Sequence, residues 1–512
     1  MTNPTAAIRM LITYAVCIPV AITVGYLLTD PLDYGTLGFL GLLIAILISP
    51  IFIKWHYPML VFGLGCPIIC FFIVGKPPFS QVIVVLSLGI ALTERILNVN
   101  GEKRFLSVPA MTWPLLYICA VTYLTAELNG GIQLQHMGGE GAGGGRKYLD
   151  IFLGAAGFFA LTSQAIPRAR RKLYLMLYML PSLMGLISDL FPYLPSPLNK
   201  INLLFPPTSL FEEGITVGTT RLSALSFAIG TVMYYMLARY GLRGIFSATK
   251  PWRGLFFVMA FLLSLLGGYR SSLGGLIAAL TLIFFLEGMH RTRLLPLLLL
   301  AGVLGGTVLA VVSDKLPFTF QRSMCFLPLF KWDEAAVIDA RNSSEWRYAI
   351  WRETWPKVPE HLLLGKGYTI TAEEYSFMGN QIFDKGSINA SDQGLAVSGD
   401  YHSGPLSTLM PFGIWGGIGM LWLMGAVFYV TYHNYRYGDP ELKTMNTYFF
   451  AASISGPIFF LFVVGALTQS VTGFASLAGF SVALNGGMAR PKPQPVVNPR
   501  IKPLPAGATQ PA

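Results

Sequence analysis

Arginine and histidine side chains stand at three points of the sequence where they could bind an anion or move a proton. The first is Arg270, which interrupts an otherwise uncharged run from Gly254 to Leu286. Because about 20 apolar residues cross a bilayer, that run predicts a helical hairpin with Arg270 at its outer tip. A charged group near hydrocarbon is costly and therefore marks a candidate functional site. The alternative is an arginine that reaches the lipid headgroups or marks a turn.

The second point is Arg347, in the segment 341-RNSSEWRYAIWRETWPKVPEHLLLGKGY-368. This segment predicts an amphipathic helix that is capped by Asn342 and ends before Pro356. Arg347 and Trp351 are four residues apart and so share a face of that helix. A guanidinium grips a phosphate and a sugar packs on an aromatic ring, so the pair suits binding of both. The alternative is a helix whose tryptophans lie on the membrane interface while its arginines face water.

The third point is His402, which directly precedes a long apolar segment in 400-DYHSGPLSTLMPFGIWGGIG-419. An imidazole at this membrane surface could accept a proton from a hydroxyl near neutral pH. Asp400, two residues earlier, could orient the ring. The alternative is a structural histidine at a helix entry. Gly413 and Gly417 have a spacing that is typical of close helix packing.

These side chains must be positioned by membrane-spanning helices, because the composition is not that of a soluble protein. Of 512 residues, 53% are apolar and only 12% are charged, against roughly a quarter charged in an ordinary soluble domain. We expect an all-α polytopic membrane protein with about 12 to 14 transmembrane helices and one large external loop that contains short helices. The expected spans are 8–28, 35–53, 58–75, 79–93, 105–126, 149–166, 173–191, 222–238, 254–269, 272–288, 294–313, 405–431, 448–466 and 471–485.

Lysine and arginine residues set the expected orientation through the positive-inside rule. If the N-terminus is cytoplasmic, alternation of the spans places most basic residues of the short loops inside, among them the cluster 168-RARRK-172. Both termini are therefore expected in the cytoplasm. The net charge of +11 would suggest a nucleic-acid partner for a soluble protein. Here it follows from membrane orientation, so we expect a lipid bilayer and no nucleic acid as partner.

Four regions follow from this pattern. Residues 1–313 form N-terminal transmembrane helices, about eleven spans, and residues 403–486 form about three more. Between them, residues 314–402 make a large loop, and loops of such length without structure are uncommon unless they have a function. Residues 487–512 are expected to be a disordered, proline-rich cytoplasmic tail. The glycine-rich loop 127–147 is expected to be a flexible external hairpin without chemistry.

Several enzyme classes lack their motifs in this chain. There is no phosphate-binding Gly-xxxx-Gly-Lys-Ser/Thr loop, no His-Glu-xx-His zinc motif, no Gly-x-Ser-x-Gly nucleophile and no Asp-x-Asp pair. The five cysteines form no disulfide framework. We therefore expect neither a metal site nor a cofactor. Few carboxylates lie in the spans, which argues against an ion-coupled transporter.

Taken together, these motifs resemble the bacterial O-antigen ligases, O-antigen polymerases and protein O-oligosaccharyltransferases of the O-antigen ligase-related superfamily. The ligase pattern is a His, then Asn, Ser or Gln, nine residues, Gly, two residues and Gly. It is similar to His402 and Ser403 followed by Gly413 and Gly416, with no gap in the spacing.

Three further positions contribute to the resemblance. An arginine, a tryptophan, a proline and a Gly-x-Gly of the family look like Arg347, Trp351, Pro359 and 365-GKG-367. The Ser-Arg-Gly-like turn that opens a family helix is similar to this chain only at Arg270. Arg221 resembles the arginine that opens an earlier helix on the periplasmic side.

The resemblance implies a glycosyltransferase of the bacterial inner membrane with its site in the periplasm. Such an enzyme moves a glycan from undecaprenyl-pyrophosphate to a hydroxyl acceptor, with inversion and without a metal, a nucleotide sugar or a covalent intermediate. Arg270 and Arg347, with Arg221, would bind the diphosphate and stabilise its developing charge. His402, oriented by Asp400, would deprotonate the acceptor, and Trp351 would contact a sugar.

The sequence leaves the acceptor open. With lipid A core as acceptor the enzyme is a ligase, with another lipid-linked repeat it is an O-antigen or exopolysaccharide polymerase, and with a Ser or Thr hydroxyl it is a protein glycosylase. A different class, a transporter or flippase for an anionic lipid-linked solute, would use the same arginines as a binding site. A transporter needs no proton acceptor at His402, so this residue discriminates the two classes.

Overall fold

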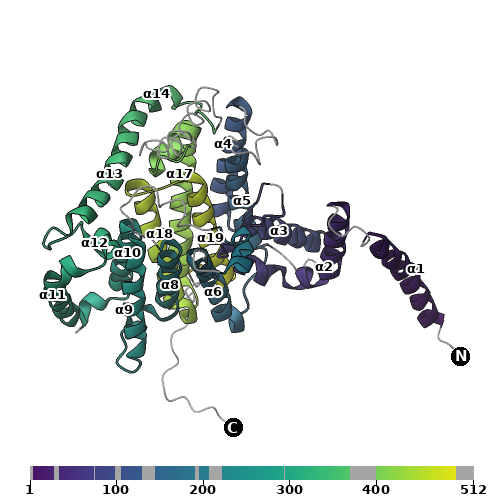
Figure 1. Ribbon diagram of the computed structural model, residues 1–512, viewed down its shortest axis with the longest axis horizontal. Helices are drawn as coiled ribbons and strands as arrows, with labels where there is room; N and C mark the ends of the chain where they lie inside the picture. Colours follow the sequence, from purple (N-terminus) through teal and green to yellow (C-terminus); the bar gives the residue numbers. More distant parts are fainter. Residues whose placement is uncertain are drawn as a thin grey trace, which may run out of the picture. The chain divides into compact units, whose positions relative to one another are not determined.

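The computed structural model describes residues 4–27, 34–73, 75–97, 105–129, 145–190, 195–206, 222–292, 294–368 and 399–491. Across these ranges the chain is helical, with short 3-10 turns and an isolated bridge between Ile69 and Pro78 (Figure 1). Within them, seven helices are long and apolar enough to cross a membrane, and three more apolar helices are shorter. The prediction of an all-α polytopic membrane protein is therefore confirmed.

The chain divides into two units, residues 1–59 and residues 60–512. The first unit contains α1 (Pro4–Leu27) and the beginning of α2 (Tyr34–Leu64). Exposed apolar side chains occur in α1 from Tyr14 to Tyr26, among them Ile18 and Ile22. A helix that is apolar on its exposed side is suited to lipid rather than water.

The expected spans 35–53 and 58–75 are wrong in one respect, because a single helix, α2, runs through both and ends at Leu64. The residues after it form a turn in which the Cys70 amide donates to the Pro77 carbonyl at 2.9 Å. Hydropathy does not detect this break, since residues 66–75 are as apolar as a helix. Prolines at positions 67, 77 and 78 explain it, because proline lacks the amide hydrogen and disfavours the helical conformation in the residue before it.

The other expected spans coincide with helices or, at 173–191, with two short helices joined by a 3-10 turn. The helices of the second unit are α3 (Phe79–Leu97), α4 (Pro109–Asn129), α5 (Gly145–Leu161), α6 (Arg171–Met179), α7 (Leu186–Leu190), α8 (Ser223–Ile245), α9 (Trp252–Ser264), α10 (Arg270–Leu286), α11 (Leu294–Val312), α12 (Phe318–Met324), α13 (Glu334–Thr354), α14 (Val358–His361), α17 (Gly404–Tyr437), α18 (Lys443–Phe462) and α19 (Leu467–Asn485).

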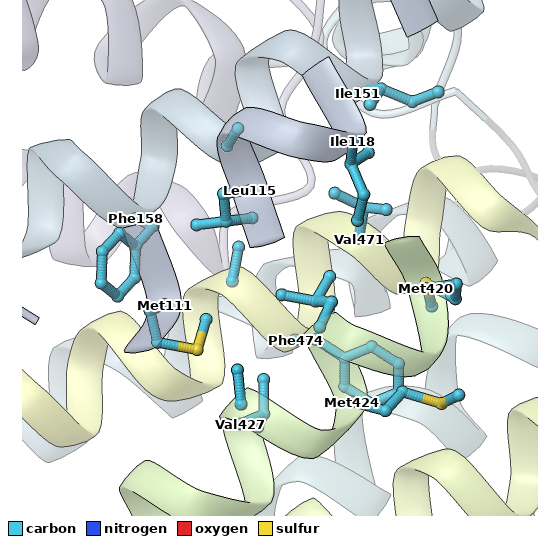
Figure 2. Close-up of a cluster of buried hydrophobic side chains, with 14 of the residues drawn as sticks. Met111, Leu115, Ile118, Ile151, Phe158, Met420, Met424, Val427, Val471 and Phe474 are labelled. Carbon is cyan, nitrogen blue, oxygen red and sulfur yellow. The ribbon is translucent and has the colours of Figure 1, made fainter. Parts of the chain in front are cut away.

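The core of this unit lies where α4, α5, α17 and α19 meet (Figure 2). Met111 of α4, Phe158 of α5, Val427 of α17 and Phe474 of α19 are among its buried side chains. Small residues let membrane helices approach closely, and a Cβ added at Gly154 of α5 would lie 2.7 Å from a side-chain oxygen of α19. This packing gives the helices that carry the candidate site a rigid support.

Candidate functional site

Arg270 lies at the tip of a helical hairpin, as the sequence predicts. Helix α9 ends at Ser264, a 3-10 turn follows, and α10 begins at Arg270. Gly268 reverses the chain with a φ of 69°, a left-handed conformation that glycine adopts without steric cost. The turn therefore delivers the guanidinium to the end of the hairpin.

Helix α13, which presents Arg347, begins earlier than the sequence predicts. Its N-cap is Asp333, whose carboxylate accepts the Ala335 amide at 2.8 Å. Asn342, the expected cap, lies inside the helix, so that prediction is wrong. The reason is that residues 334–340 contain three alanines and a glutamate, all strong helix formers, behind a better-placed aspartate cap. The expected end of the helix before Pro356 is confirmed.

Arg270 contacts α13 directly. Its Nη2 donates to the Ala340 carbonyl at 2.6 Å and to the Ser344 hydroxyl at 3.1 Å. Both bonds use the same nitrogen, so α13 holds the guanidinium by one edge. Arg347 lies three residues after Ser344 and therefore on the same face of α13.

Arg322 of α12, which the sequence analysis did not single out, is a third arginine of this site. Its side chain is 5% exposed. Its Nε donates to the Asp339 carboxylate of α13, and its Nη1 donates to the Gly268 carbonyl in the hairpin turn. Arg322 thus connects α12 and α13 to the turn that carries Arg270. The short segment 318-FTFQRSM-324 gives no pattern that marks this arginine or identifies its partner.

The three guanidiniums influence one another electrostatically. Burial lowers the pKa of Arg347, and the positive charges of Arg270 and Arg322 act in the same direction. Asp339 forms a direct ion pair with Arg322. Its negative charge therefore offsets mainly the charge of Arg322. An excess of positive charge in a partly buried place favours an anionic ligand, and a phosphate group with two negative charges has the required chemistry.

His402 stands immediately before α17 in an unusual backbone conformation. Its φ is 48°, a value rarely adopted by residues other than glycine, although Asn, Asp and His are enriched there. The Asp400 carboxylate accepts the His402 amide at 3.1 Å and lies 3.5 Å from Nδ1 of the ring. Asp400 therefore sits where the sequence predicts, beside the imidazole and its backbone.

Trp351 joins α13 to the segment that carries His402. Its indole Nε1 donates to the Tyr401 carbonyl at 2.9 Å. The same segment packs against α13 and α14 through a small apolar cluster that includes Ile350, Tyr401 and Leu406. Because Trp351 lies one turn beyond Arg347, the arginine cluster and His402 are brought to neighbouring positions along one helix.

Helix α17 contains a sharp break at Gly413, where φ is 59° and ψ is −156°. After the break the helix folds against its own first turns, since a Cβ added at Gly416 would lie 3.4 Å from Thr408 and one at Gly417 would lie 3.2 Å from Leu409. Gly417 therefore serves close packing within α17, whereas Gly413 makes room for the Leu362 carbonyl of a separate segment. The glycines fix the short segment that begins just after His402.

The segment 365-GKG-367 holds the other end of this short helix. The Lys366 amide donates to the Met410 carbonyl at 2.7 Å, and the Gly367 amide donates to the Pro411 carbonyl at 2.9 Å. The break at Gly413 makes the Met410 and Pro411 carbonyls part of a helix end, where carbonyls lack helical donors, and these two amides supply them. A side chain at Gly365 would overlap the Pro411 carbonyl, which explains the glycine there.

Lys147 of α5 interacts electrostatically with Asp400, although it lies at the end of the segment 127–147 that the sequence predicted to be a loop without chemistry. Its ammonium lies 5.3 Å from the centre of the Tyr368 ring. Asp400 and Asp150 are the acidic groups that stabilise its charge. Lys147 therefore contributes positive charge that acts on Asp400.

Two cavities open beside the first turn of α10. One, of about 360 Å³, lies between α8, α10 and α18 and is lined by Tyr234, Ser271, Gly275 and Phe459 among others. The other, of about 240 Å³, lies between α8 and the α9–α10 hairpin and includes Tyr269 in its lining. Both are mostly apolar, and both begin at residues next to Arg270.

Arg221 lies outside the described residues, so its expected place in the site stays a prediction. Among the residues that the structure describes, no three His, Cys, Asp or Glu side chains are grouped as a metal site requires. The expectation of a metal-independent site also stays a prediction.

These observations describe a polytopic membrane protein with arginines and a histidine gathered around α13. Residues 255–421 match the O-Antigen ligase family, a range that runs from α9 to the broken part of α17. The matched range covers about a third of the chain and includes Arg270, Arg347 and His402, and over this range the chain is similar to O-antigen ligases. A search of curated proteins found no match.

Proposed function

We propose that this protein is a glycosyltransferase of the bacterial inner membrane. It moves a glycan from undecaprenyl-pyrophosphate to a hydroxyl acceptor at the periplasmic face, without a metal and with inversion at the anomeric carbon. Both termini lie in the cytoplasm, and residues 314–402 form the periplasmic loop. The observation that carries the proposal is the arrangement of Arg270, Arg347 and His402 around α13.

In this mechanism the arginines bind the pyrophosphate. Arg270 and Arg347, together with Arg221, neutralise its charge, and Arg322 holds the hairpin turn in place. Charge accumulates on the pyrophosphate as the sugar leaves, and cations that are already fixed stabilise this charge without reorganisation. The bond Arg270 makes to α13 and the rigid Arg322–Asp339 pair supply that fixation.

His402 acts on the acceptor. The acceptor oxygen forms a bond to the anomeric carbon while the bond from that carbon to the pyrophosphate oxygen breaks, and the pyrophosphate leaves with the electron pair. The hydroxyl proton passes to the imidazole. Because Nδ1 faces Asp400, the accepting nitrogen in this proposal is Nε2. Trp351 positions the histidine through Tyr401, and a sugar packs on its ring.

The apolar cavities beside α10 support a lipid-linked donor. Their position next to Arg270 allows a pyrophosphate at the guanidinium and an isoprenoid chain between α8, α10 and α18. A soluble sugar nucleotide would have no use for an apolar cavity at this depth. The acceptor we favour is lipid A core, which makes the protein a ligase. A lipid-linked repeat unit as acceptor would make it a polymerase.

The test is glycan transfer by the purified full-length protein in lipid vesicles. The donor is an undecaprenyl-pyrophosphate glycan, and the acceptors offered separately are lipid A core, a second lipid-linked repeat and a Ser/Thr peptide. We expect product with lipid A core, retained in excess chelator and lost in His402→Ala and Arg347→Ala. Transfer to the repeat alone would identify a polymerase. Unchanged transfer in both variants would overturn the assigned site, and loss on chelation would overturn the metal-free mechanism.

A further inference from the structure

A turn of three exposed leucines follows α14. The exposed fractions are 38% for Leu362, 68% for Leu363 and 65% for Leu364. Consecutive exposed apolar residues are unfavourable in water unless another surface covers them. The opposite side of α14 already packs on the protein through Val358, which is 6% exposed and belongs to the cluster around Tyr401. The leucines therefore face away from the protein core.

The turn is fixed to the break in α17. The Leu362 carbonyl accepts the Ile414 amide at 2.7 Å, and the Gly365 amide closes the turn onto the His361 carbonyl at 2.8 Å. A Cβ at Gly413 would overlap the Leu362 carbonyl. The leucines thus sit at the start of the long part of α17 that follows the break, in a helix that has the length and composition to cross a membrane.

The leucines continue an apolar stripe on that helix. Ile414, Trp415, Ile418, Leu421 and Trp422 are 38% to 60% exposed. Their positions, i, i+1, i+4, i+7 and i+8, place them on one helical face. An exposed apolar face on a membrane-spanning helix faces lipid. The bond between Leu362 and Ile414 makes the leucine turn an extension of this lipid-facing surface.

The residues that precede the turn are typical of a membrane interface. Trp355 is 50% exposed, and Lys357 is exposed beside it. Tryptophan and lysine are enriched at the level of the lipid headgroups, where an apolar body and a polar end are both accommodated. Glu360 is also exposed, so the charge around the turn is mixed, and the argument rests on the apolar surface.

We propose that Leu362, Leu363 and Leu364 insert into the membrane leaflet at the Gly413 end of α17. The turn then acts as a lipid anchor for the loop that carries α13. Through Val358 and Trp351, which both contact the segment before His402, the anchor sets the height of the candidate site above the bilayer. This anchor is independent of which glycan acceptor the protein uses.

The test is site-specific photo-crosslinking in the full-length protein, reconstituted in vesicles of phosphatidylethanolamine and phosphatidylglycerol. The photoreactive residue p-benzoylphenylalanine replaces Leu363, whose side chain is 68% exposed. A positive control carries the same residue at Trp415, on the lipid-facing stripe of α17. A second control carries it at Glu345, 65% exposed and ion-paired with Arg341 on α13.

We expect phospholipid adducts by mass spectrometry at position 363, at a level within about threefold of position 415, and none above background at position 345. A chain-to-chain adduct at position 363 would overturn the proposal in favour of a contact with a second copy. An adduct to another segment of the same chain, or no phospholipid adduct, would overturn it in favour of cover by the protein or exposure to water.

Discussion

The indole nitrogen of Trp351 donates to the carbonyl of Tyr401 at 2.9 Å, and this bond joins the helix of Arg347 to the residue before His402. The side chain of Trp351 thus connects the residues proposed for anion binding to the residue proposed for proton transfer. Tyr401 is further held by its amide, which donates to the Ser407 hydroxyl at 3.2 Å. The backbone at His402 is therefore fixed from α13 on one side and from α17 on the other.

Replacing the indole by a ring without a donor tests this connection. We expect Trp351→Phe to lower kcat by about 5- to 10-fold, since one hydrogen bond contributes about 1 kcal/mol and the histidine loses its positioning. The KM for the donor should change less than twofold if the pyrophosphate is held by the arginines alone. Steady-state glycan transfer measures both constants.

The matched control for that change is Trp355→Phe. Trp355 is half exposed and lies outside the apolar cluster that contains Trp351. Its variant should retain the wild-type kcat. An equal loss in both variants would contradict a specific positioning role for Trp351.

Arg347 should lower the stability of the ligand-free folded protein and at the same time increase its activity. Burial and the charges of Arg270 and Arg322 disfavour its guanidinium, so Arg347→Met should raise the unfolding temperature in the absence of ligand. The same variant should lose about 10- to 100-fold in kcat/KM, because a bond to a charged group contributes about 1.5 to 3 kcal/mol.

Adding inorganic pyrophosphate distinguishes the loss of an anion site in Arg347→Met from a general effect of the substitution on packing. Its addition should raise the unfolding temperature of the wild type more than that of Arg347→Met, since a ligand stabilises the state that binds it. Arg341→Met, on an exposed part of the same helix, is the control. Equal stabilisation of all three proteins would argue against an anion site at Arg347.

The sequence predicts the membrane helices well because each one carries its own signal. The uncharged run around Arg270 exceeds the length of one span, so a hairpin with this residue at its tip follows from length alone. The same reasoning fails at residues 65–78, where apolar composition continues although prolines interrupt the helix. Hydropathy measures how favourably a segment enters lipid. It does not register that a proline lacks the amide hydrogen a helix needs.

The site was predictable only in part. The types and order of Arg270, Arg347 and His402 indicate chemistry, and the structure places them along α13. Arg322 and Lys147 were missed because their importance comes from contacts with residues distant in the chain, Gly268 for the first and the surroundings of Asp400 for the second. One sequence lists these charges but does not show which of them are buried together.

The break in α17 gives a sharp prediction for its glycines. Gly413→Ala should strongly destabilise the protein, since alanine is unfavourable at a φ of 59° and its Cβ would overlap the Leu362 carbonyl. A cost of about 2 kcal/mol or more is expected from strain and overlap together. Gly425→Ala in the same helix is the control, because no atom lies within 4 Å of the added Cβ. Thermal unfolding in vesicles should show a lower temperature for the first variant and an unchanged or higher one for the second.

The pair formed by Arg322 and Asp339 should be sensitive to removal of one partner. Asp339→Asn leaves a buried guanidinium without its counter-charge, and such changes cost about 3 to 5 kcal/mol. The double variant Arg322→Met/Asp339→Leu should recover part of that loss, since it removes both charges. Unfolding measurements on the wild type, the two single variants Asp339→Asn and Arg322→Met and the double variant show how far the two changes depend on each other. Equal stability of the wild type and Asp339→Asn would show that the ion pair contributes nothing to the fold.

His402 can be tested without disturbing its backbone. Asparagine tolerates positive φ better than alanine does. The free energy of unfolding of His402→Asn should therefore stay within about 1 kcal/mol of the wild-type value. The substitution removes the proton acceptor, and general-base catalysis contributes about 10²- to 10⁴-fold. We therefore expect kcat to fall by about that factor while binding of the lipid-linked donor is kept. Retention of kcat in a folded His402→Asn protein would exclude the histidine as the base and would favour a protein that binds and moves the lipid-linked glycan without transferring it.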